Sequence, residues 1–351
     1  MPQRKISNRL QAASADAGIR DVARTAGVST ASVSRSLNRP ETVSPEIRAK
    51  VERAVRRLGY VPNAGARALT LNRSHTIGAV IPTIDNAIFA KGIEALQKHL
   101  ARFKYHVLLA TSGYDPVLEG EQAVNLVARG VDGLIFMGAT HTAELGRFLA
   151  RRAIPYVNTG TYDPRSGAAC VGFDNAEAIG RAARFLLDLG HVRIALLAGI
   201  TRDNDRMIER VRGVRRALRA AGLELPRERL AERPFDVGEA REGLRALMAA
   251  SPRPTAVVCA NDVLAHGALI EAAALGIAVP EALSIVGFDD LEIARHLRPS
   301  LTTVRVPTED MWQLAADYLL ATIEGRPARR HTRIDVSLVV RESTGPAPKA
   351  G

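Results

Sequence analysis

The apolar residues between positions 19 and 37 recur at the three- and four-residue spacing of two short helices joined by a tight turn. Ala23 is small enough to stand where the helices cross, and Gly27 can take the positive φ angle that ends the first helix. Val33 and Leu37 form an apolar stripe that faces the first helix. The pattern predicts a helix-turn-helix unit whose outward positions are Thr30, Ala31, Ser32 and Arg35.

A third helix is predicted directly after this unit. Ser44 suits its N-cap, Pro45 its first position and Gly59 its C-terminal end. One face of this helix is apolar and carries Ile47, Val51, Val55 and Leu58. We expect residues 18–61 to form an all-α headpiece whose small core is only marginally stable alone.

From position 76 onward the pattern changes to short apolar runs that alternate with amphipathic helices. Such alternation indicates parallel sheets covered by helices on both faces. The length is too great for one doubly wound sheet, and two strand ends, VGFDN at 171–175 and VGFDD at 286–290, look alike. The sequence therefore predicts a two-lobed α/β core, with the carboxyl ends of the strands around a cleft.

The flanking segments differ in composition from these two parts. Residues 1–17 have no apolar periodicity and are expected to be a disordered basic leader, and residues 346–351 a short tail. Residues 62–75 are small and polar, so a linker is one interpretation. The other is a short hinge helix, too short to be stable in water, that folds when it binds.

The charge is concentrated at the N-terminal end. The net charge is +11, and residues 1–75 hold 14 Lys and Arg against 5 Asp and Glu, whereas residues 76–351 hold 34 against 32. A basic small module is typical of phosphate binding, although an arginine-rich proteome could also supply the arginines. The chain has two cysteines, Cys170 and Cys259, both in apolar runs, which suggests a reducing compartment. With no apolar run of membrane-spanning length and no signal core, we expect a cytoplasmic protein with no membrane partner.

No enzyme signature is found in the sequence. There is no metal-ligand cluster, phosphate loop or nucleophile elbow, and the eight histidines are scattered. We therefore expect no catalytic residue, no metal and no cofactor. His191 is expected to make a structural contact.

The motifs together resemble the lactose-repressor (LacI/GalR) family of bacterial transcription regulators. The matching pieces include DVARTAGVSTASVSRSLN, VSPEIRAKVERAVRRLGYVPNAGARAL, IGAVIPTIDNAIFA, LGHVRIALLAG, RVRGV, CANDVLAHGAL and LSIVGFDD, in this order. The resemblance implies an all-α helix-turn-helix headpiece, a hinge helix and a core like a periplasmic sugar-binding protein. It also implies a homodimer on a pseudo-palindromic double-stranded operator, controlled by a sugar or sugar-acid effector. The sign of that control stays open.

The resemblance divides the core at 76–345 into an N-terminal lobe of about 76–174 and 304–332 and a C-terminal lobe of about 175–303 and 333–345. The chain is expected to cross between the lobes near Asp174, near Leu301 to Val304 and near Arg333. A solute-binding protein of sugar transport and a sugar-modifying enzyme are the alternatives that the core alone would permit. The basic headpiece opposes the first, and the missing catalytic constellation opposes the second.

The positions that match the family's DNA contacts lie in the second helix and the hinge. Arg35 can bond the edge of guanine or a phosphate, and Leu69 would wedge into the minor groove, although it can also be a plain linker residue. Because Thr30 and Ala31 have small side chains, we expect operator recognition to depend partly on DNA shape. The predicted DNA-binding residues are Thr30, Ala31, Ser32, Ser34, Arg35, Asn38, Asn63, Ala66, Arg67 and Leu69.

The positions that match the family's effector site follow strand ends or begin helices. Phe89 can stack on a sugar ring or belong to the core, and Arg210 can bond hydroxyls or a carboxylate. In carrying Tyr114 and His141, the chain resembles the branch of the family whose effectors are sugar acids such as gluconate. Asp262 and Asp290 are expected to be helix caps. The predicted effector-binding residues are Asp85, Asn86, Phe89, Tyr114, His141, Asp174, Arg206, Arg210, Asn261 and Asp289.

Overall fold

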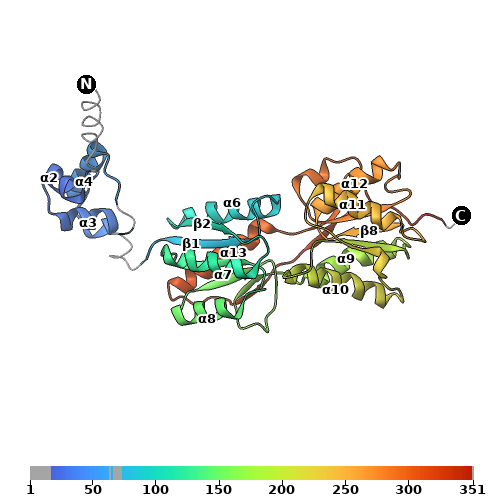
Figure 1. Ribbon diagram of the computed structural model, residues 1–351. Coiled ribbons are helices and arrows are strands. Elements are labelled where there is room, and N and C mark those ends of the chain that lie inside the picture. Colours follow the sequence, from blue (N-terminus) through green and yellow to red (C-terminus); the bar gives the residue numbers. More distant parts are fainter. Residues whose placement is uncertain (1–16, 63–64, 66–72, 350–351) are drawn as a thin grey trace, which may run out of the picture. The chain divides into compact units, whose positions relative to one another are not determined.

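The computed structural model describes residues 17–62, 65 and 73–349, and the chain divides into two compact units at the boundary between Ser74 and His75 (Figure 1). Most of the predicted leader, the greater part of the predicted hinge helix and four predicted DNA contacts lie outside the described residues. These four are Asn63, Ala66, Arg67 and Leu69.

The N-terminal unit is a three-helix headpiece formed by α2 (Ile19–Ala26), α3 (Thr30–Asn38) and α4 (Pro45–Leu58). The turn between α2 and α3 depends on Gly27, whose φ of 65° is left-handed, as the sequence predicts. Ser29 caps α3 by accepting a hydrogen bond from the backbone N–H of Ser32, and a short 3₁₀ turn (Pro40–Thr42) leads to α4. The buried core consists of Val22, Ala23, Val33, Val51 and Ala54.

The second unit contains two six-stranded sheets, one in each of two lobes. In the first, the N-lobe, the strand order is β11-β5-β4-β3-β1-β2. In the second, the C-lobe, it is β12-β10-β9-β8-β6-β7. The N-lobe strands are β1 (Thr76–Ile81), β2 (His106–Thr111), β3 (Gly133–Met137), β4 (Tyr156–Thr159), β5 (Cys170–Gly172) and β11 (His331–Arg333). The C-lobe strands are β6 (Ile194–Ala198), β7 (Leu230–Glu232), β8 (Ala256–Cys259), β9 (Ser284–Asp289), β10 (Thr302–Arg305) and β12 (Ser337–Val339).

Long helices flank the sheet of each lobe (Figure 1). Those of the N-lobe are α6 (Ala87–Ala101), α7 (Pro116–Ala128), α8 (Ala143–Arg152) and α13 (Thr308–Ile323). Those of the C-lobe are α9 (Asn175–Asp188), α10 (Asp205–Ala220), α11 (Val237–Met248) and α12 (Asp262–Ala274), with short 3₁₀ turns at Arg227–Arg229 and Glu292–Arg295. The neighbouring strands pair in parallel except for β10 with β12, so the two-lobed α/β fold class is confirmed.

The chain passes between the lobes three times. It leaves the N-lobe after β5, returns after β10 and crosses again between β11 and β12. The second passage follows Arg305, because β10 stays paired with β9 up to the register partners Arg305 and Asp289. All three passages lie at the edge of each sheet that is formed by the carboxyl ends of its parallel strands and that faces the other lobe.

The two cysteines are buried and His191 makes a structural contact, as the sequence predicts. Cys170 and Cys259 are free thiols buried in β5 and β8. His191 is fully buried, and its ring nitrogens lie 2.9 Å from Thr255 Oγ1 and 3.1 Å from Ser284 Oγ. Burial lowers the pKa of His191, so the neutral ring joins these elements.

Candidate functional site

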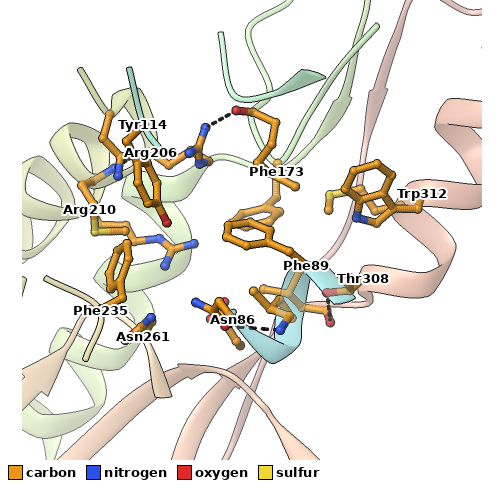
Figure 2. Close-up of a pocket in the computed structure, with 18 residues that line it drawn as sticks. Asn86, Phe89, Tyr114, Phe173, Arg206, Arg210, Phe235, Asn261, Thr308 and Trp312 are labelled. Carbon is orange, nitrogen blue, oxygen red and sulfur yellow. Dashed lines mark hydrogen bonds between the residues drawn. The ribbon is translucent and has the colours of Figure 1, made fainter. Parts of the chain in front are cut away.

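A narrow cavity lies between the two lobes, at the carboxyl ends of their strands. It holds about 60 Å³ and adjoins a wider space of about 760 Å³ that shares four of its lining residues. Figure 2 shows side chains from both lobes converging on it. The lining residues are Asn86, Ile88, Phe89, Tyr114, Met137, Gly160, Phe173, Asn204, Arg206, Met207, Arg210, Phe235, Asn261, Asp289, Val306, Thr308, Met311 and Trp312.

Arg210 is the best-fixed cation of the cavity. Its Nε donates to Asn175 Oδ1 at 3.0 Å, its Nη1 donates to the carbonyl of Ala260 at 2.6 Å, and its guanidinium carbon lies 3.7 Å from the centre of the Phe288 ring. Burial lowers the pKa of Arg210 only to about 10, so it remains charged at neutral pH. A charged, rigidly held guanidinium is suited to bonding ligand hydroxyls or a carboxylate.

Asp289 supplies the acidic group of the cavity. It is the last residue of β9 and has a φ of 118°, which turns the chain at the strand exit. Burial raises the pKa of its carboxyl to about 7, against the opposing effect of Arg210. At neutral pH the cavity therefore offers an acid that can both donate and accept hydrogen bonds.

Three asparagines surround the cavity, and each caps a helix. The side-chain oxygens of Asn86, Asn204 and Asn261 accept hydrogen bonds from the backbone N–H groups of Ile88, Met207 and Leu264. The cap uses the oxygen of each carboxamide, so its NH₂ group can donate to a ligand. A ligand with several oxygen acceptors fits this ring of donors.

Aromatic rings form the apolar walls. Tyr114 and Phe235 lie with ring centroids 5.9 Å apart, and burial raises the pKa of the Tyr114 hydroxyl to about 12. Trp312 is fully buried, and its indole N–H has no partner among the described residues. Figure 2 shows Phe89 and Phe173 between these groups. Flat aromatic faces beside polar groups are typical of sugar recognition.

Arg206 joins the lobes beside the cavity. Its Nη1 donates to the carbonyl of Met137 at 2.8 Å, while the carboxylate of the neighbouring Asp205 accepts a hydrogen bond from the backbone N–H of Ala139 at 3.1 Å. The backbone N–H of Asp205 donates to Thr140 Oγ1 at 3.3 Å. The first turn of α10 is thus bound to the loop that follows β3.

Seven of the predicted effector residues line the cavity: Asn86, Phe89, Tyr114, Arg206, Arg210, Asn261 and Asp289. The other three do not. Asp85 lines the wider space. Asp174 caps α9 by accepting a hydrogen bond from Glu177.

His141 lies away from the cavity, between Glu119 at 2.5 Å and Asn158 at 3.0 Å. Burial alone would lower the pKa of His141, but the hydrogen bond and charge of Glu119 together with Asn158 raise it. This ring is therefore held by groups of the N-lobe.

Two cap predictions were wrong. Asn261 caps α12, and Asp262, one position later, binds the hydroxyl of Thr303 and the backbone N–H of Leu291. Asp290 caps no helix, because its carboxylate pairs with Arg305 and Arg341, each at 2.6 Å. Both acids are engaged by partners that are distant in the sequence.

The sequence interpretation missed several lining residues. Phe173 follows β5, so the rule that ligands gather at strand ends could have found it. Asn204, which caps α10, was included only as part of the polar loop TRDNDRM at 201–207, one of the segments that could line the cleft. Trp312 lies within the first two turns of α13, and no local pattern points to it.

The predicted recognition helix of the headpiece, α3, presents polar and small side chains. Thr30, Ala31 and Arg35 are exposed, and Ser32, Ser34 and Asn38 are partly buried. Arg35 Nε donates to the carbonyl of Ala31 at 3.4 Å, a contact that keeps the side chain along the helix surface.

Two family models match the chain: bacterial regulatory proteins of the lacI family over residues 18–63, and a periplasmic binding protein-like domain over residues 183–344. The chain is 36% identical over 329 residues to the HTH-type transcriptional regulator GntR of Pseudomonas aeruginosa, covering 93% of this chain and 95% of that protein. The chain belongs to the LacI family. Its resemblance to this family, predicted from the sequence, is confirmed.

Other relatives match most or nearly all of the chain. The Ribose operon repressor of Escherichia coli K12 is 32% identical over 93% of this chain and 98% of its own. The lac repressor dimer bound to operator and the anti-inducer ONPF superposes with a TM-score of 0.83 at 25% identity, covering 93% of this chain and 99% of that one. GntR from Chromobacterium violaceum gives 0.73 at 33% identity, covering 77% and 99%.

The function class follows from the family. As a LacI family member the chain is a DNA-binding transcription regulator and not an enzyme, and its relatives are named as transcriptional regulators and repressors. The transport and enzyme alternatives are therefore not favoured. In the described part of the chain, no helix is long and apolar enough to cross a membrane. No group of three or more potential metal ligands occurs within the same residues.

Proposed function

We propose that this regulator is a homodimeric repressor whose affinity for a pseudo-palindromic operator is set by a small sugar or sugar acid bound in the interlobe cavity. One observation carries the proposal: Arg210, Asp289 and Asn261 of the C-lobe face Asn86 and Phe89 of the N-lobe across a single cavity. A ligand that bonds to both lobes stabilises the arrangement in which they are close together. Because operator DNA lies in the bacterial cytoplasm, we expect the protein to act there.

The ligand and the operator are coupled through the relative stability of two core arrangements. The ligand can favour one arrangement while operator DNA favours the second. In that case ligand and DNA each lower the protein's affinity for the other by the same factor, with a coupling free energy of about 1–3 kcal/mol. If both favour the same arrangement, the ligand acts as a corepressor. The sign is read directly from operator binding with and without ligand.

A sugar acid is the ligand class that the charges favour. Arg206 and Arg210 both line the cavity, whereas Asp289 is the lining acid and its raised pKa keeps part of it neutral at pH 7. Arg206 pairs with Asp205 at 3.1 Å, so the positive charge left for a ligand is that of Arg210 beside the partly neutral Asp289, which suits a carboxylate with several hydroxyls. The names of the GntR relatives are consistent with the branch that the sequence resembles.

The effector test uses the full-length chain and operator DNA from its own promoter. Fluorescence anisotropy of the labelled operator is measured during titration with gluconate, related sugar acids and neutral sugars. Arg210→Lys keeps the charge but loses the guanidinium fork, so we expect ligand affinity to fall about tenfold with unchanged operator affinity in the absence of ligand. Arg147→Lys, on the exposed face of α8, is the matched control. If no sugar or sugar acid changes operator affinity or thermal stability, the proposal is wrong.

The DNA test uses the same assay with headpiece variants. Arg35→Ala and Leu69→Ala should each weaken operator binding by about 1–3 kcal/mol, while Arg24→Ala, an exposed arginine on α2, should change it less. For Arg35, a loss that is equal on operator and unrelated DNA would indicate a phosphate contact, and a loss confined to the operator would indicate base reading. Unchanged affinity in both variants would overturn the assignment of these residues.

A further inference from the structure

The outer face of α10 carries a stripe of arginines that the effector cavity does not use. Arg212, Arg215, Arg216 and Arg219 are separated by three and four residues, so they share one side of the helix, and all four are exposed. They line a groove of about 580 Å³ together with Thr201, Ile208, Val211, Leu230 and Glu232, which we call the arginine groove. It lies between α10 and β7, the edge strand of the C-lobe sheet.

The positive charge of the arginine groove is only partly compensated. Arg212 pairs with Glu209 at 2.7 Å. Within the residues that the structure describes, Arg215, Arg216 and Arg219 have no carboxylate within ion-pair distance. Glu232, the acid among the lining residues, instead accepts hydrogen bonds from the backbone N–H and hydroxyl of Thr201.

On α11, the next α-helix along the chain, two arginines four residues apart are compensated by a carboxylate. There Arg241 and Arg245 both pair with the buried carboxylate of Glu271 on α12, at 2.9 Å and 2.5 Å. Like charges three and four residues apart destabilise a helix when nothing compensates them. The stripe on α10 therefore has an unfavourable arrangement that a bound anion would relieve.

The shape and chemistry of the groove indicate what kind of anion fits. Guanidinium groups bind phosphate oxygens through two parallel hydrogen bonds, and several of them side by side suit more than one phosphate charge. Ile208, Val211 and Leu230 add an apolar surface for a carbon skeleton, and the volume lies in the range of small-molecule sites. We propose that the arginine groove binds a small organic phosphate, such as a sugar phosphate or a nucleotide.

Such a ligand would give the regulator a second input. The same helix carries Arg206 and Arg210 into the effector cavity from its first two turns, and the arginine groove follows within the next turns. A phosphate held on the outer face would fix the position of α10 and hence of both cavity arginines. Effector affinity should then depend on the concentration of the phosphorylated compound, by the reciprocal coupling of two sites.

The test measures binding to the full-length protein by isothermal titration calorimetry. The probes are inorganic pyrophosphate, magnesium-free ATP and a hexose bisphosphate, with the unphosphorylated hexose as the neutral control. The groove variant combines Arg215→Gln, Arg216→Gln and Arg219→Gln, because glutamine keeps helix propensity on an exposed face. The matched control combines Arg147→Gln, Arg151→Gln and Arg152→Gln on α8, which removes the same charge from exposed positions of the N-lobe.

We expect wild type and the α8 variant to bind at least one organic phosphate, with affinity reduced about tenfold or more in the groove variant. The single variant Arg216→Gln provides a milder test if the triple variant melts at a lower temperature. Equal affinity in the groove variant and wild type would overturn the proposal, since the phosphate would then occupy another site such as the effector cavity. Absence of binding by wild type, or binding only of long non-operator DNA at this face, would also overturn it.

Discussion

Arg206 of the C-lobe donates a hydrogen bond to the carbonyl oxygen of Met137 in the N-lobe, at 2.8 Å. The bond is possible because the next residue of the N-lobe is Gly138, with a φ of 96°. A Cβ built at this position would overlap the Arg206 guanidinium. The close approach of the two lobes at the rim of the cavity thus depends on one glycine.

The variant Gly138→Ala should break the hydrogen bond between Arg206 and the Met137 carbonyl. Alanine at a positive φ costs about 1–2 kcal/mol, and its Cβ excludes Arg206 from the Met137 carbonyl. We expect ligand affinity to fall about tenfold or more, with operator binding by the headpiece retained. Calorimetric titration of the effector together with operator anisotropy measures both quantities.

Gly146→Ala is the control for that experiment. Gly146 lies within α8, and a Cβ there meets nothing within 4 Å. Alanine in an exposed helix interior should stabilise the protein by up to about 1 kcal/mol without affecting the ligand. If both variants bind the ligand as wild type does, the bridge made by Arg206 has no part in ligand affinity.

Trp312 should report ligand binding directly. It is the one tryptophan in the sequence and lines the cavity, so the environment of its indole changes when a ligand enters the cavity. We expect a shift in the intensity or wavelength of its emission that saturates at the ligand concentration that saturates calorimetry. Trp312→Phe should remove the signal, and a saturating ligand that leaves the emission of wild type unchanged would place the binding site elsewhere.

Asp289 should make the core less stable as the pH rises. Its carboxyl has a pKa near 3.9 in an unfolded chain and about 7 in the fold, where burial raises it. The folded state therefore holds the proton more tightly, and the stabilisation present below pH 4 is lost as the pH rises towards 7. Asp262, whose pKa burial raises to about 8, acts in the same direction.

The variant Asp289→Asn removes one of these two groups. Asparagine tolerates the positive φ of this position and stays neutral, so the decline in melting temperature of the core between pH 5 and pH 8 should become smaller without disappearing. Differential scanning calorimetry of both proteins in the absence of ligand measures it. An identical pH dependence in the two proteins would show that Asp289 is ionised throughout this range.

The stability of the headpiece should be sensitive to a substitution that creates a small cavity in its core. Val51 is fully buried against α2 and α3, and Val51→Ala should cost about 2 kcal/mol, a large fraction of the stability of so small a core. We expect loss of operator binding with an unchanged melting temperature of the core. Val61→Ala, at a position that is 81% exposed, is the control and should bind operator normally.

Local signals sufficed where the physical cause is local. Gly27, Ser44, Pro45 and Gly59 end or begin helices as their backbone preferences require, and the headpiece could be predicted almost residue by residue. The alternation of strands and helices likewise predicted two sheets. In the cavity, Asn86, Arg210 and Asp289 were found because they stand at strand exits or match a family motif.

Other features depend on partners that are far apart in the sequence. Aspartate is a common helix-capping residue, so the sequence predicted that Asp290 caps a helix. In the folded C-lobe, however, Arg305 and Arg341 approach its carboxylate and form two charge-assisted contacts with it instead. Glu119 and Asn158 likewise hold His141 outside the lining of the cavity. The sequence by itself determined the elements and the two units, because backbone preference and apolar periodicity act over a few residues, and the order of its motifs indicated the family by resemblance. Only the tertiary structure decided which side chains share the cavity, because burial, charge pairing and the close approach at Gly138 arise when distant segments meet.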